Sequence, residues 1–299
     1  MSAPPDLVSV VMPAFNVGWC VGRAVDSVLS QSLRERELVV VDDGSTDDTN
    51  EVLASYGDAI RVIRQPNAGM SAARNVGIRQ SQGKLVAFLD ADDWWYTDKL
   101  ERQVDLMRRH PELGFCSTAA RVVNPEGQLL NVWHCPGSTA DMLQTLFAEN
   151  AAIAGGCSAV MVRRELLDRV GLFDESLRGF EDPDLWIRLA AVTGYACIGE
   201  PLVEILRREH SVSRNLEHMR KAALASLRKN RDLLPAHLRG AFWRSCLASV
   251  YTDYAKGAYR AGEVRTAVAD TLRAFALAPA GRGRLCLGLL RDMALRRSL

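Results

Sequence analysis

The sequence lacks several features that would place it in a specialised class of protein. Its seven cysteines include no C-x-x-C pair, so we expect buried free thiols and neither a zinc site nor a disulfide framework. No run approaches the roughly 18 to 20 apolar residues that span a bilayer. The first residues have no basic region followed by an apolar one, as a signal peptide would, so we expect a cytoplasmic protein.

The chain has little net charge, but its charges are unevenly distributed. The formal net charge is +1, which gives no reason to expect a polyanionic partner such as nucleic acid. Residues 216–299 hold 16 basic and 6 acidic side chains, whereas residues 1–215 hold 21 and 30. This basic tail is explained either by a solvated helical face or by contact with an anionic surface.

The first 90 residues alternate between short apolar runs and segments with helical periodicity. The apolar runs end in turn residues, as buried strands do, and they are 7–12, 38–41, 60–63 and 85–89. Because nearly all their residues are apolar, we expect a parallel sheet covered by helices on both faces. The sequence therefore predicts an α/β domain at 1–215 and a helical C-terminal region at 216–299.

Polar clusters follow three of these predicted strands, at Pro13–Asn16, Asp42–Asp47 and Asp90–Asp93. An open α/β sheet binds its ligands in the crevice beyond the carboxyl ends of its strands. Three such clusters on one edge of the sheet predict a ligand site there.

The cluster at Asp90–Asp93 has the composition of a metal site. Its three carboxylates repel one another unless a cation neutralises them. Hard oxygen ligands suit Mg²⁺ or Mn²⁺, which usually bind one or two carboxylates together with the phosphates of a substrate. The alternative is a solvated acidic turn that caps a helix starting near Thr97. The two tryptophans that follow the cluster favour a formed pocket.

Two further residues are placed to contact a nucleotide. Asp43 ends the second strand opposite the first loop, where it can accept a hydrogen bond from a base or a ribose, with Pro13 and Phe15 as apolar walls. Arg74 lies early in a helix after a glycine turn, where a cation suits a diphosphate. The structural alternatives are an Asx-type turn at Asp43 and a surface arginine at position 74.

The second half of the chain adds three candidates. Glu181 and Asp182 precede Pro183 at the start of a predicted helix, where a carboxylate can act as a general base. The alternative for Asp182 is a purely structural helix cap. His210 follows a strand-like run and is a candidate metal ligand, although a lone histidine is more often structural.

In their order along the chain these motifs resemble those of the inverting glycosyltransferases of family 2, which have the GT-A fold, a Rossmann-like, mostly parallel sheet flanked by helices. The resemblance covers about residues 7–215. It rests on the segments VSVVMPAFN at 8–16, ELVVVDDGSTD at 37–47, NAGMSAARNVG at 67–77, FLDADD at 88–93 and the Glu181-Asp182 pair with LWIRL at 185–189. The tail after residue 215 is poorly covered.

The resemblance implies a role for each matching residue. The implied nucleotide-binding residues are Pro13, Ala14, Phe15, Asn16, Asp43, Arg74, Asp90 and Ala91. The implied metal ligands are Asp92, Asp93 and His210, and which of the two aspartates binds directly stays open. The implied catalytic residues are the general base Asp182 and its neighbour Glu181.

The resemblance also implies a reaction. Mn²⁺ or Mg²⁺, together with Arg74, would offset the charge on a departing nucleoside diphosphate, while Asp182 takes a proton from the acceptor hydroxyl in one inverting displacement. The sequence lacks the Q-x-x-R-W motif of processive members, so we expect transfer of a single sugar, with a UDP-sugar as the favoured donor. The expected acceptor is a glycan or a lipid-linked sugar in cell-surface polysaccharide or glycolipid assembly.

Two other functions fit parts of the pattern. One is a nucleotide-sugar-binding protein without catalysis, which the full set of acidic residues disfavours. The other is a phosphatase of the haloacid dehalogenase type, whose D-x-D motif usually follows the first strand, whereas here the motif follows the fourth.

The basic tail suggests a further partner. Residues 255–278 are typical of a helical hairpin with its turn at Gly262-Glu263, and 281–299 predict an arginine-rich helix that is apolar on one side. Such a helix can lie on the anionic inner face of a membrane, where lipid-linked acceptors reside, or form a homodimer contact.

Overall fold

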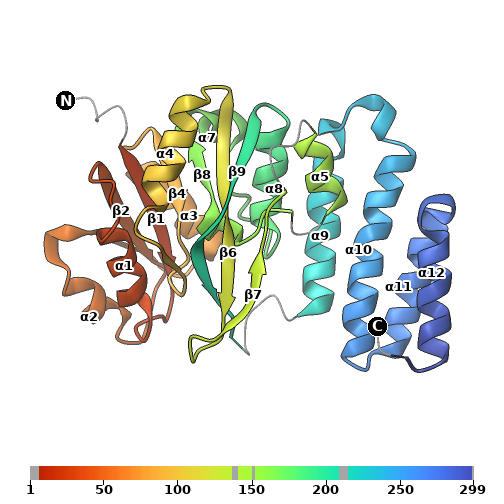
Figure 1. Cartoon of the computed structure of the whole chain (residues 1–299). Helices are drawn as coiled ribbons and strands as arrows, with labels where there is room; N and C mark the ends of the chain where they lie inside the picture. Colours follow the sequence, from red (N-terminus) through yellow and green to blue (C-terminus); the bar gives the residue numbers. More distant parts are fainter. Residues whose placement is uncertain (1–6, 137–140, 150–151, 209–214, 298–299) are drawn as a thin grey trace. The chain divides into compact units, whose positions relative to one another are not determined.

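The computed structural model describes residues 7–136, 141–149, 152–208 and 215–297, and these residues form two compact units (Figure 1). Unit 1 contains the described residues up to 142, 152–175 and 192–208. Unit 2 contains 143–149, 176–191 and 215–297. The units thus interleave along the chain, and the domain division at residue 215 remains a prediction.

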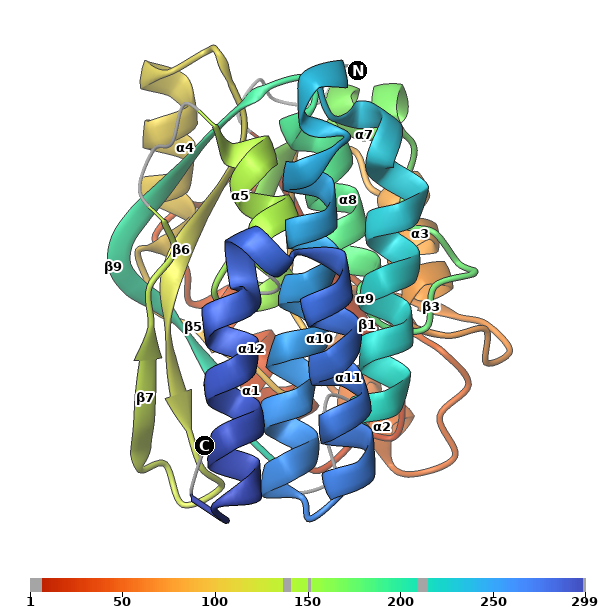
Figure 2. The ribbon, with the colours of Figure 1, turned by 90° about the vertical axis from the view of Figure 1, so that its right-hand side faces the viewer.

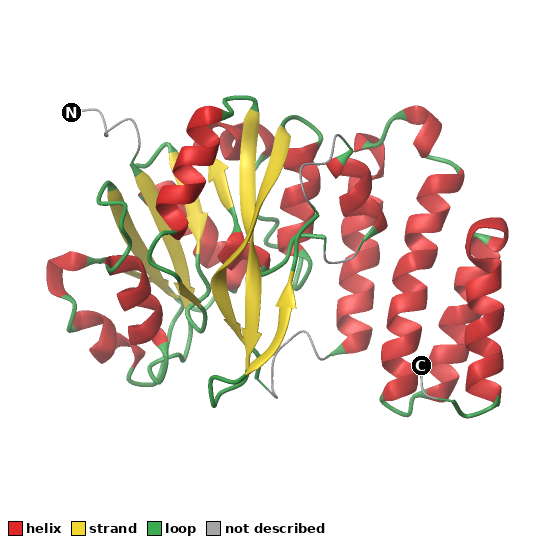
Figure 3. Ribbon diagram, viewed as in Figure 1, coloured by secondary structure: helices red, strands yellow, loops and turns green. Residues whose placement is uncertain are grey.

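Unit 1 is built on a mixed sheet of nine strands among the described residues (Figure 3). The strand order is β3-β2-β1-β4-β8-β6-β9-β5, and β7 pairs with β6. The strands are β1 Val8–Ala14, β2 Arg36–Asp42, β3 Arg61–Arg64, β4 Leu85–Phe88, β5 Trp94–Trp95, β6 Leu113–Val123, β7 Leu129–Trp133, β8 Met161–Arg163 and β9 Gly194–Leu206.

The first four strands confirm the predicted parallel sheet. β2 pairs in parallel with both β1 and β3, and β1 pairs in parallel with β4. The sheet then becomes mixed, because β8 is antiparallel to both β4 and β6, whereas β9 is parallel to β6. The fold matches the predicted α/β architecture.

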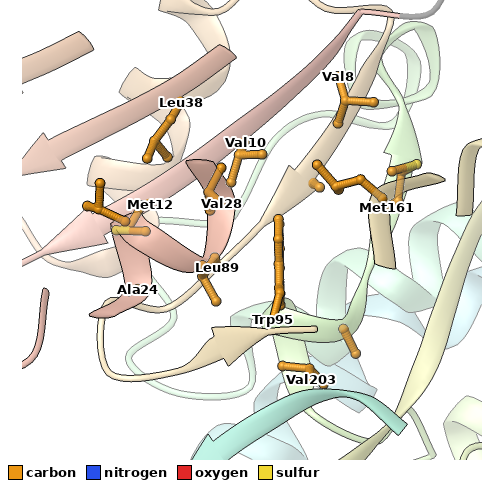
Figure 4. Packing of buried hydrophobic residues seen from close by; sticks show 14 of the residues in the cluster. Val8, Val10, Met12, Ala24, Val28, Leu38, Leu89, Trp95, Met161 and Val203 are labelled. Atoms are coloured by element: carbon orange, nitrogen blue, oxygen red, sulfur yellow. The ribbon is translucent and has the colours of Figure 1, made fainter. Parts of the chain in front are cut away.

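Helices cover both faces of this sheet. They are α1 Val21–Leu29, α2 Thr49–Ala54, α3 Met70–Gln80, α4 Lys99–Arg109, α6 Gly156–Ala159, α7 Arg164–Val170 and the 3₁₀ turn η1 Gly57–Ala59. Successive strand residues point to opposite faces. Val10 and Val40 therefore pack with Val28 of α1 and Leu100 of α4, whereas the odd-numbered valines of β2 pack with Ala73 of α3. Figure 4 shows the larger of these two clusters.

The apolar run at 158–162 is only partly extended, because α6 occupies Gly156–Ala159 and β8 begins at Met161. Gly155 and Gly156 have positive φ angles of 75° and 51°, which reverse the chain direction and start a helical turn.

The expectation that all cysteines are free thiols is also wrong. Cys135 and Cys197 form a disulfide across 62 residues of sequence. β9 runs parallel to β6, which places Cys197 beside Ser117. Cys135 follows β7, and its sulfur lies 3.1 Å from the same serine hydroxyl. No local spacing marks such a pair. The other five cysteines are free, as expected.

Unit 2 is helical, which confirms the prediction for residues 216 onward. Its helices are α5 Met142–Ala148 (whose first residue belongs to unit 1), α8 Glu181–Ala190, α9 Leu216–Asn230, α10 Ala241–Arg260, α11 Val264–Leu277, α12 Pro279–Ala294 and the 3₁₀ turns η3 Arg231–Leu233 and η4 Ala236–Leu238. Figure 2 shows α9 to α12 side by side. The predicted hairpin is α10 and α11, with Gly262 at a φ angle of 81° in the turn. Among the helices described, none is long and apolar enough to cross a membrane.

Candidate active site

The three polar clusters lie at one edge of the sheet, as predicted. β1 lies between β2 and β4, with Ala14 beside Asp42 and Val11 beside Phe88. The Asp43 amide continues this pairing by donating to the Ala14 carbonyl at 2.8 Å. Because the three strands are parallel, their carboxyl ends and the residues that follow meet at this edge.

The loop after β1 is fixed to the segment after β2. Asn16 has a positive φ angle of 53°, its amide donates to Ser45 Oγ at 2.9 Å, and its Oδ1 accepts from the Thr46 amide at 2.8 Å. These bonds hold the loop while the Phe15 ring stays 48% exposed. A flat exposed ring on a fixed loop is available for stacking against a ligand.

Asp43 holds the segment that leads into α3. Its Oδ1 accepts from Gln65 Nε2 at 2.7 Å and from the Ala68 amide at 2.9 Å, and its Oδ2 accepts from the Gly69 amide at 2.8 Å. Gly69 is the N-cap of α3 and has a φ angle of 96°, a conformation that favours glycine. Asp43 therefore sets where α3 begins.

Arg74 of α3 is a buried residue, and the surface-arginine alternative is wrong. Its Nη2 lies 2.7 Å from Asp90 Oδ1, and its side chain is 3% exposed against 33% for Asp90. Its guanidinium also lies 5.3 Å from the centre of the Phe173 ring. The neighbouring Asn75 fixes that segment, because its side chain donates to the Phe173 carbonyl and accepts from the Phe173 amide.

Asp93 is committed to protein partners. Its Oδ2 accepts from the Ser158 hydroxyl at 2.6 Å, and its Oδ1 accepts from the Leu206 amide at 3.1 Å. Burial, followed by the charges of Asp92 and Asp90, raises the pKa of Asp93 well above its usual range. Asp93 thus joins the turn after β4 to α6 and to the end of β9. The acidic turn is not a helix cap, because the N-cap of α4 is Asp98.

Asp92 is the more accessible neighbour. Its Oδ2 lies 2.5 Å from Arg208 Nη2, and the two side chains are 23% and 41% exposed. Burial and then the charge of Asp90 raise the pKa of Asp92, whereas Arg208 lowers it. Arg208 therefore neutralises Asp92 in this structure.

The donor set at this edge fits a hard divalent cation only in part. Within the described ranges, no group of three His, Cys, Asp or Glu side chains is placed to hold a metal. Asp92 offers hard oxygen and does not tie distant segments together as Asp93 does, so a cation here would need phosphate or water oxygens as its other ligands. The remaining predicted ligand, His210, lies outside the described residues.

Three residues of this site were missed from the sequence. Ser158 accepts from the Asp90 amide at 3.1 Å and donates to Asp93, and its carbonyl accepts from Trp95 Nε1 at 2.8 Å. The Gly155-Gly156 pair before it is a turn signal and carries no sign of this contact. Leu206 and Arg208 lie at and just beyond the end of β9, where no motif distinguishes them.

Glu181 and Asp182 lie in unit 2, at the start of α8. The helix begins at Glu181 and its N-cap is Phe180, so the capping role considered for Asp182 is wrong. Phe180 has a φ angle of 58°, which is uncommon for a bulky residue and costs about 1–3 kcal/mol. Such strain clusters at functional sites. Glu181 is buried and Asp182 is half-buried.

A second carboxylate of α8 is structural. Asp184 is fully buried, and its oxygens accept from Arg188 at 2.8 Å, Lys229 at 3.0 Å and Asn230 at 2.8 Å. These contacts join α8 to the end of α9 within unit 2. The i,i+4 spacing of Asp184 and Arg188 is the one sequence signal that pointed to this network.

Comparison with known proteins gives a consistent result. The family model described as glycosyl transferase family 2 matches residues 9–171. An uncharacterized glycosyltransferase from Rickettsia felis is 33% identical over 201 residues, which cover 66% of this chain and 32% of that protein. The chain thus corresponds to about a third of that relative's length.

Two further proteins match over more of their length. TuaG from Bacillus subtilis, whose name gives it a proposed glycosyltransferase role in teichuronic acid biosynthesis, is 32% identical over 263 residues, covering 85% of this chain and 96% of TuaG. The crystal structure of Staphylococcus aureus TarS 1–349 with UDP-GlcNAc superposes with a TM-score of 0.70, covering 96% of this chain and 88% of that chain. At 18% identity this match supports the GT-A fold alone.

Proposed function

Because the chain belongs to glycosyl transferase family 2, we propose that it transfers one sugar from a nucleoside diphosphate sugar to an acceptor hydroxyl with inversion. The observation that carries the proposal is the pairing of buried Arg74 with Asp90, next to Asp92, at the ligand-binding edge of the sheet. The phosphatase alternative is set aside by the family assignment. The role named for TuaG favours an acceptor in cell-surface polysaccharide assembly.

The nucleotide would lie along the carboxyl ends of β2, β1 and β4. The exposed Phe15 ring offers a stacking surface. Asp43 stays the proposed acceptor for a base N–H, and because both its oxygens already accept protein hydrogen bonds, a base would have to share an oxygen with the Gln65 amide or displace it. Asp90 is one-third exposed and held by Arg74, so it can accept from ribose hydroxyls, while the buried Arg74 would add positive charge behind it for the diphosphate. A UDP-sugar is the favoured donor.

Mn²⁺ or Mg²⁺ would be held by Asp92 together with diphosphate oxygens, with His210 as a further proposed ligand. Asp92 is favoured over Asp93, because both oxygens of Asp93 already accept protein hydrogen bonds. A bound cation supplies charge stabilisation for the leaving diphosphate. In its absence Arg208 is the counter-ion of Asp92, and the two positive charges compete for one carboxylate.

The protein's own chemistry would then be a proton transfer. The acceptor oxygen attacks the anomeric carbon, the bond from that carbon to the diphosphate oxygen breaks, and the acceptor proton passes to Asp182. Glu181 would support Asp182 from the first turn of α8, where the helix N-terminus favours negative charge. The strained Phe180 would set the direction in which this turn begins.

The site of action is a separate proposal. We place the protein in the cytoplasm, at the inner face of the membrane, with the basic helices of unit 2 as its contact with anionic lipid and a homodimer as the competing arrangement. Disulfides are rare in a reducing cytosol, so Cys135 and Cys197 would be thiols there. Flotation with anionic liposomes, with and without residues 281–299, tests the lipid contact.

Calorimetry tests the donor half of the proposal. We expect UDP to bind more tightly than GDP, dTDP or CDP, and only with Mn²⁺ or Mg²⁺ present. Slow hydrolysis of the matching UDP-sugar, followed by NMR, should release the inverted anomer first. Tight binding without any hydrolysis or transfer would instead favour a nucleotide-sugar-binding protein that lacks catalysis.

A further inference from the structure

A pocket of about 270 Å³ opens in unit 1 beside the acidic turn. Its wall combines the start of α1 with the turn after β4, and its lining includes Trp19, Arg23, Asp92, Trp94, Pro125 and Leu206. None of the residues predicted to contact the nucleotide itself lines it, although Asp92, the proposed ligand of the cation, does. A ligand in this pocket would therefore lie next to the cation and the diphosphate while the nucleoside lies along the carboxyl ends of β2, β1 and β4.

Two indole rings shape this pocket. Trp19 is 58% exposed, an unusual exposure for the largest apolar side chain. The Arg208 guanidinium lies 5.2 Å from the centre of the Trp19 ring, and the Arg23 guanidinium lies 3.2 Å from the centre of the Trp94 ring. Arg23 covers the face of Trp94, so the exposed Trp19 ring is the apolar surface and the guanidinium groups are the polar donors that this pocket offers to a ligand with both kinds of surface, as sugars have.

The charges around the pocket leave one cation without a carboxylate. Asp92 is paired with Arg208, and Asp93 is buried and bonded to Ser158 and Leu206. The exposed side chain of Arg23, by contrast, makes no ion pair or hydrogen bond with any residue that the structure describes. Its guanidinium lies over the Trp94 ring, which leaves its N–H donors available to a ligand.

We propose that this pocket binds an anionic sugar unit of the acceptor, with Arg23 contacting its carboxylate or phosphate and Trp19 packing against its ring. That the bound sugar is an acceptor rests on the proposed glycosyl transfer, whereas the binding of an anionic sugar in this pocket does not depend on it. A planar guanidinium matches the two oxygens of a carboxylate or phosphate, which explains the choice of an anionic sugar over a neutral one.

The test measures binding of simple probes to the full chain, with UDP and Mn²⁺ present, by saturation-transfer NMR. The probes are methyl β-D-glucuronide, glucose 6-phosphate and the neutral methyl β-D-glucoside. We expect at least one anionic probe to bind about tenfold more tightly than the neutral one, as a charged hydrogen-bonded contact would give. Preference for the glucuronide identifies a carboxylate ligand, and preference for the sugar phosphate identifies a phosphate ligand.

Two variants and one control test whether Arg23 and Trp19 make these contacts with the sugar. Arg23→Gln should abolish the preference for the anionic probe, and Trp19→Ala should weaken all three probes alike. Arg34→Gln removes an exposed arginine near the other end of α1 and should leave every affinity unchanged. Equal binding of neutral and anionic probes, or an unchanged preference in Arg23→Gln, overturns the proposal.

The same samples separate this inference from the proposed transferase function. UDP affinity with Mn²⁺ should be the same in wild type and Arg23→Gln, because Arg23 lies outside the predicted nucleotide site. If the wild type binds no nucleotide, the transferase proposal fails, while probe binding still decides the sugar site.

Discussion

The two acidic runs of the molecule, Asp90–Asp93 in unit 1 and Glu181–Asp184 in unit 2, share one arrangement. Each contains a carboxylate that is buried and bonded to protein donors, Asp93 in the first and Asp184 in the second. Each also contains a more accessible neighbour, Asp92 or Asp182.

The difference between the runs lies in what the buried carboxylate joins. Asp93 fastens a turn to α6 and to the end of β9, whereas Asp184 fastens one helix to the end of another. A run of acidic residues therefore need not be one site. One member supports the local fold, and its neighbour is the one proposed to bind a cation or to accept a proton.

The largest effect should come from the accessible carboxylate of the second run. Asp182→Asn removes the proposed base, so transfer should fall by about 10²- to 10⁴-fold, measured as initial rate. Nucleotide affinity with Mn²⁺ should stay within about twofold, because the predicted nucleotide contacts are in unit 1. Near-normal turnover in this variant would sink the assignment of Asp182.

The buried carboxylate of the same run, Asp184, should affect stability and not transfer. Asp184→Ala leaves Arg188, Lys229 and Asn230 without their shared acceptor, and removing one side of a buried ion pair costs about 3–5 kcal/mol. Urea unfolding measures this loss. Glu217→Ala, which removes the exposed i,i+4 partner of Lys221 in α9, is the control and should change the free energy of unfolding by less than about 1 kcal/mol. Equal losses in the two variants would show that the burial of Asp184 does not matter.

The first run should show the same contrast more weakly. Asp93→Ala leaves the Ser158 hydroxyl and the Leu206 amide without their acceptor, at a cost of about 1–3 kcal/mol in the free energy of unfolding. Asp92→Ala should leave unfolding nearly unchanged and weaken UDP binding only when Mn²⁺ is present. The comparison fails if Asp93→Ala is the variant that loses metal-dependent binding while keeping full stability.

Lys99 provides the converse case, a buried amine that contacts no carboxylate among the residues that the structure describes. Its Nζ donates to Gln103 Oε1 at 2.7 Å and lies 3.9 Å from the centre of the Trp95 ring, and burial lowers its pKa to about 7. The unfolded chain therefore binds more protons than the folded one from about pH 7 up to the ordinary lysine pKa of about 10.5. Stability should rise with pH across this window by about 1 kcal/mol per unit.

The variant Lys99→Met isolates this contribution. The difference in free energy of unfolding between Lys99→Met and wild type should be largest below pH 7 and should shrink toward pH 10. A difference that does not vary with pH would show that Lys99 keeps its ordinary pKa in the folded state.

The smallest effect concerns Arg208. Arg208→Gln removes the charge that competes with a cation for Asp92, so Mn²⁺ should bind a few-fold more tightly in the absence of nucleotide. Calorimetry with Mn²⁺ alone measures this change. Arg121→Gln, which breaks the ion pair with Glu204, is the control and should leave Mn²⁺ affinity unchanged. Weaker Mn²⁺ binding in Arg208→Gln would contradict the competition.

The sequence predicted the parts of this molecule that depend on neighbouring residues. Runs of valine and isoleucine between turns were enough to place β1 to β4, and the parallel order then brought Phe15, Asp43 and Asp90 to one edge. The start of α3 was also predictable, because a glycine turn precedes Arg74.

Contacts between distant segments could not be predicted in this way. Ser158 and Arg208 lie 65 and 116 residues from their aspartate partners, and the Cys135–Cys197 bridge spans 62 residues. The three-dimensional path of β6, β7 and β9 determines these pairs, and no local pattern records it. The sequence therefore identified the acidic turn, but it could not predict which of its carboxylates is bonded within the protein and which is accessible to a ligand.

The bond between Asp93 and the Leu206 amide spans 113 residues and has a consequence for synthesis of the chain. During translation the D-x-D motif leaves the ribosome long before β9, which must emerge before the turn has its full set of partners. At about 5 to 20 residues per second, this interval lasts several seconds or more. The nascent chain would therefore carry the motif for that time without a finished site, and nucleotide binding should begin only after β9 has joined β6.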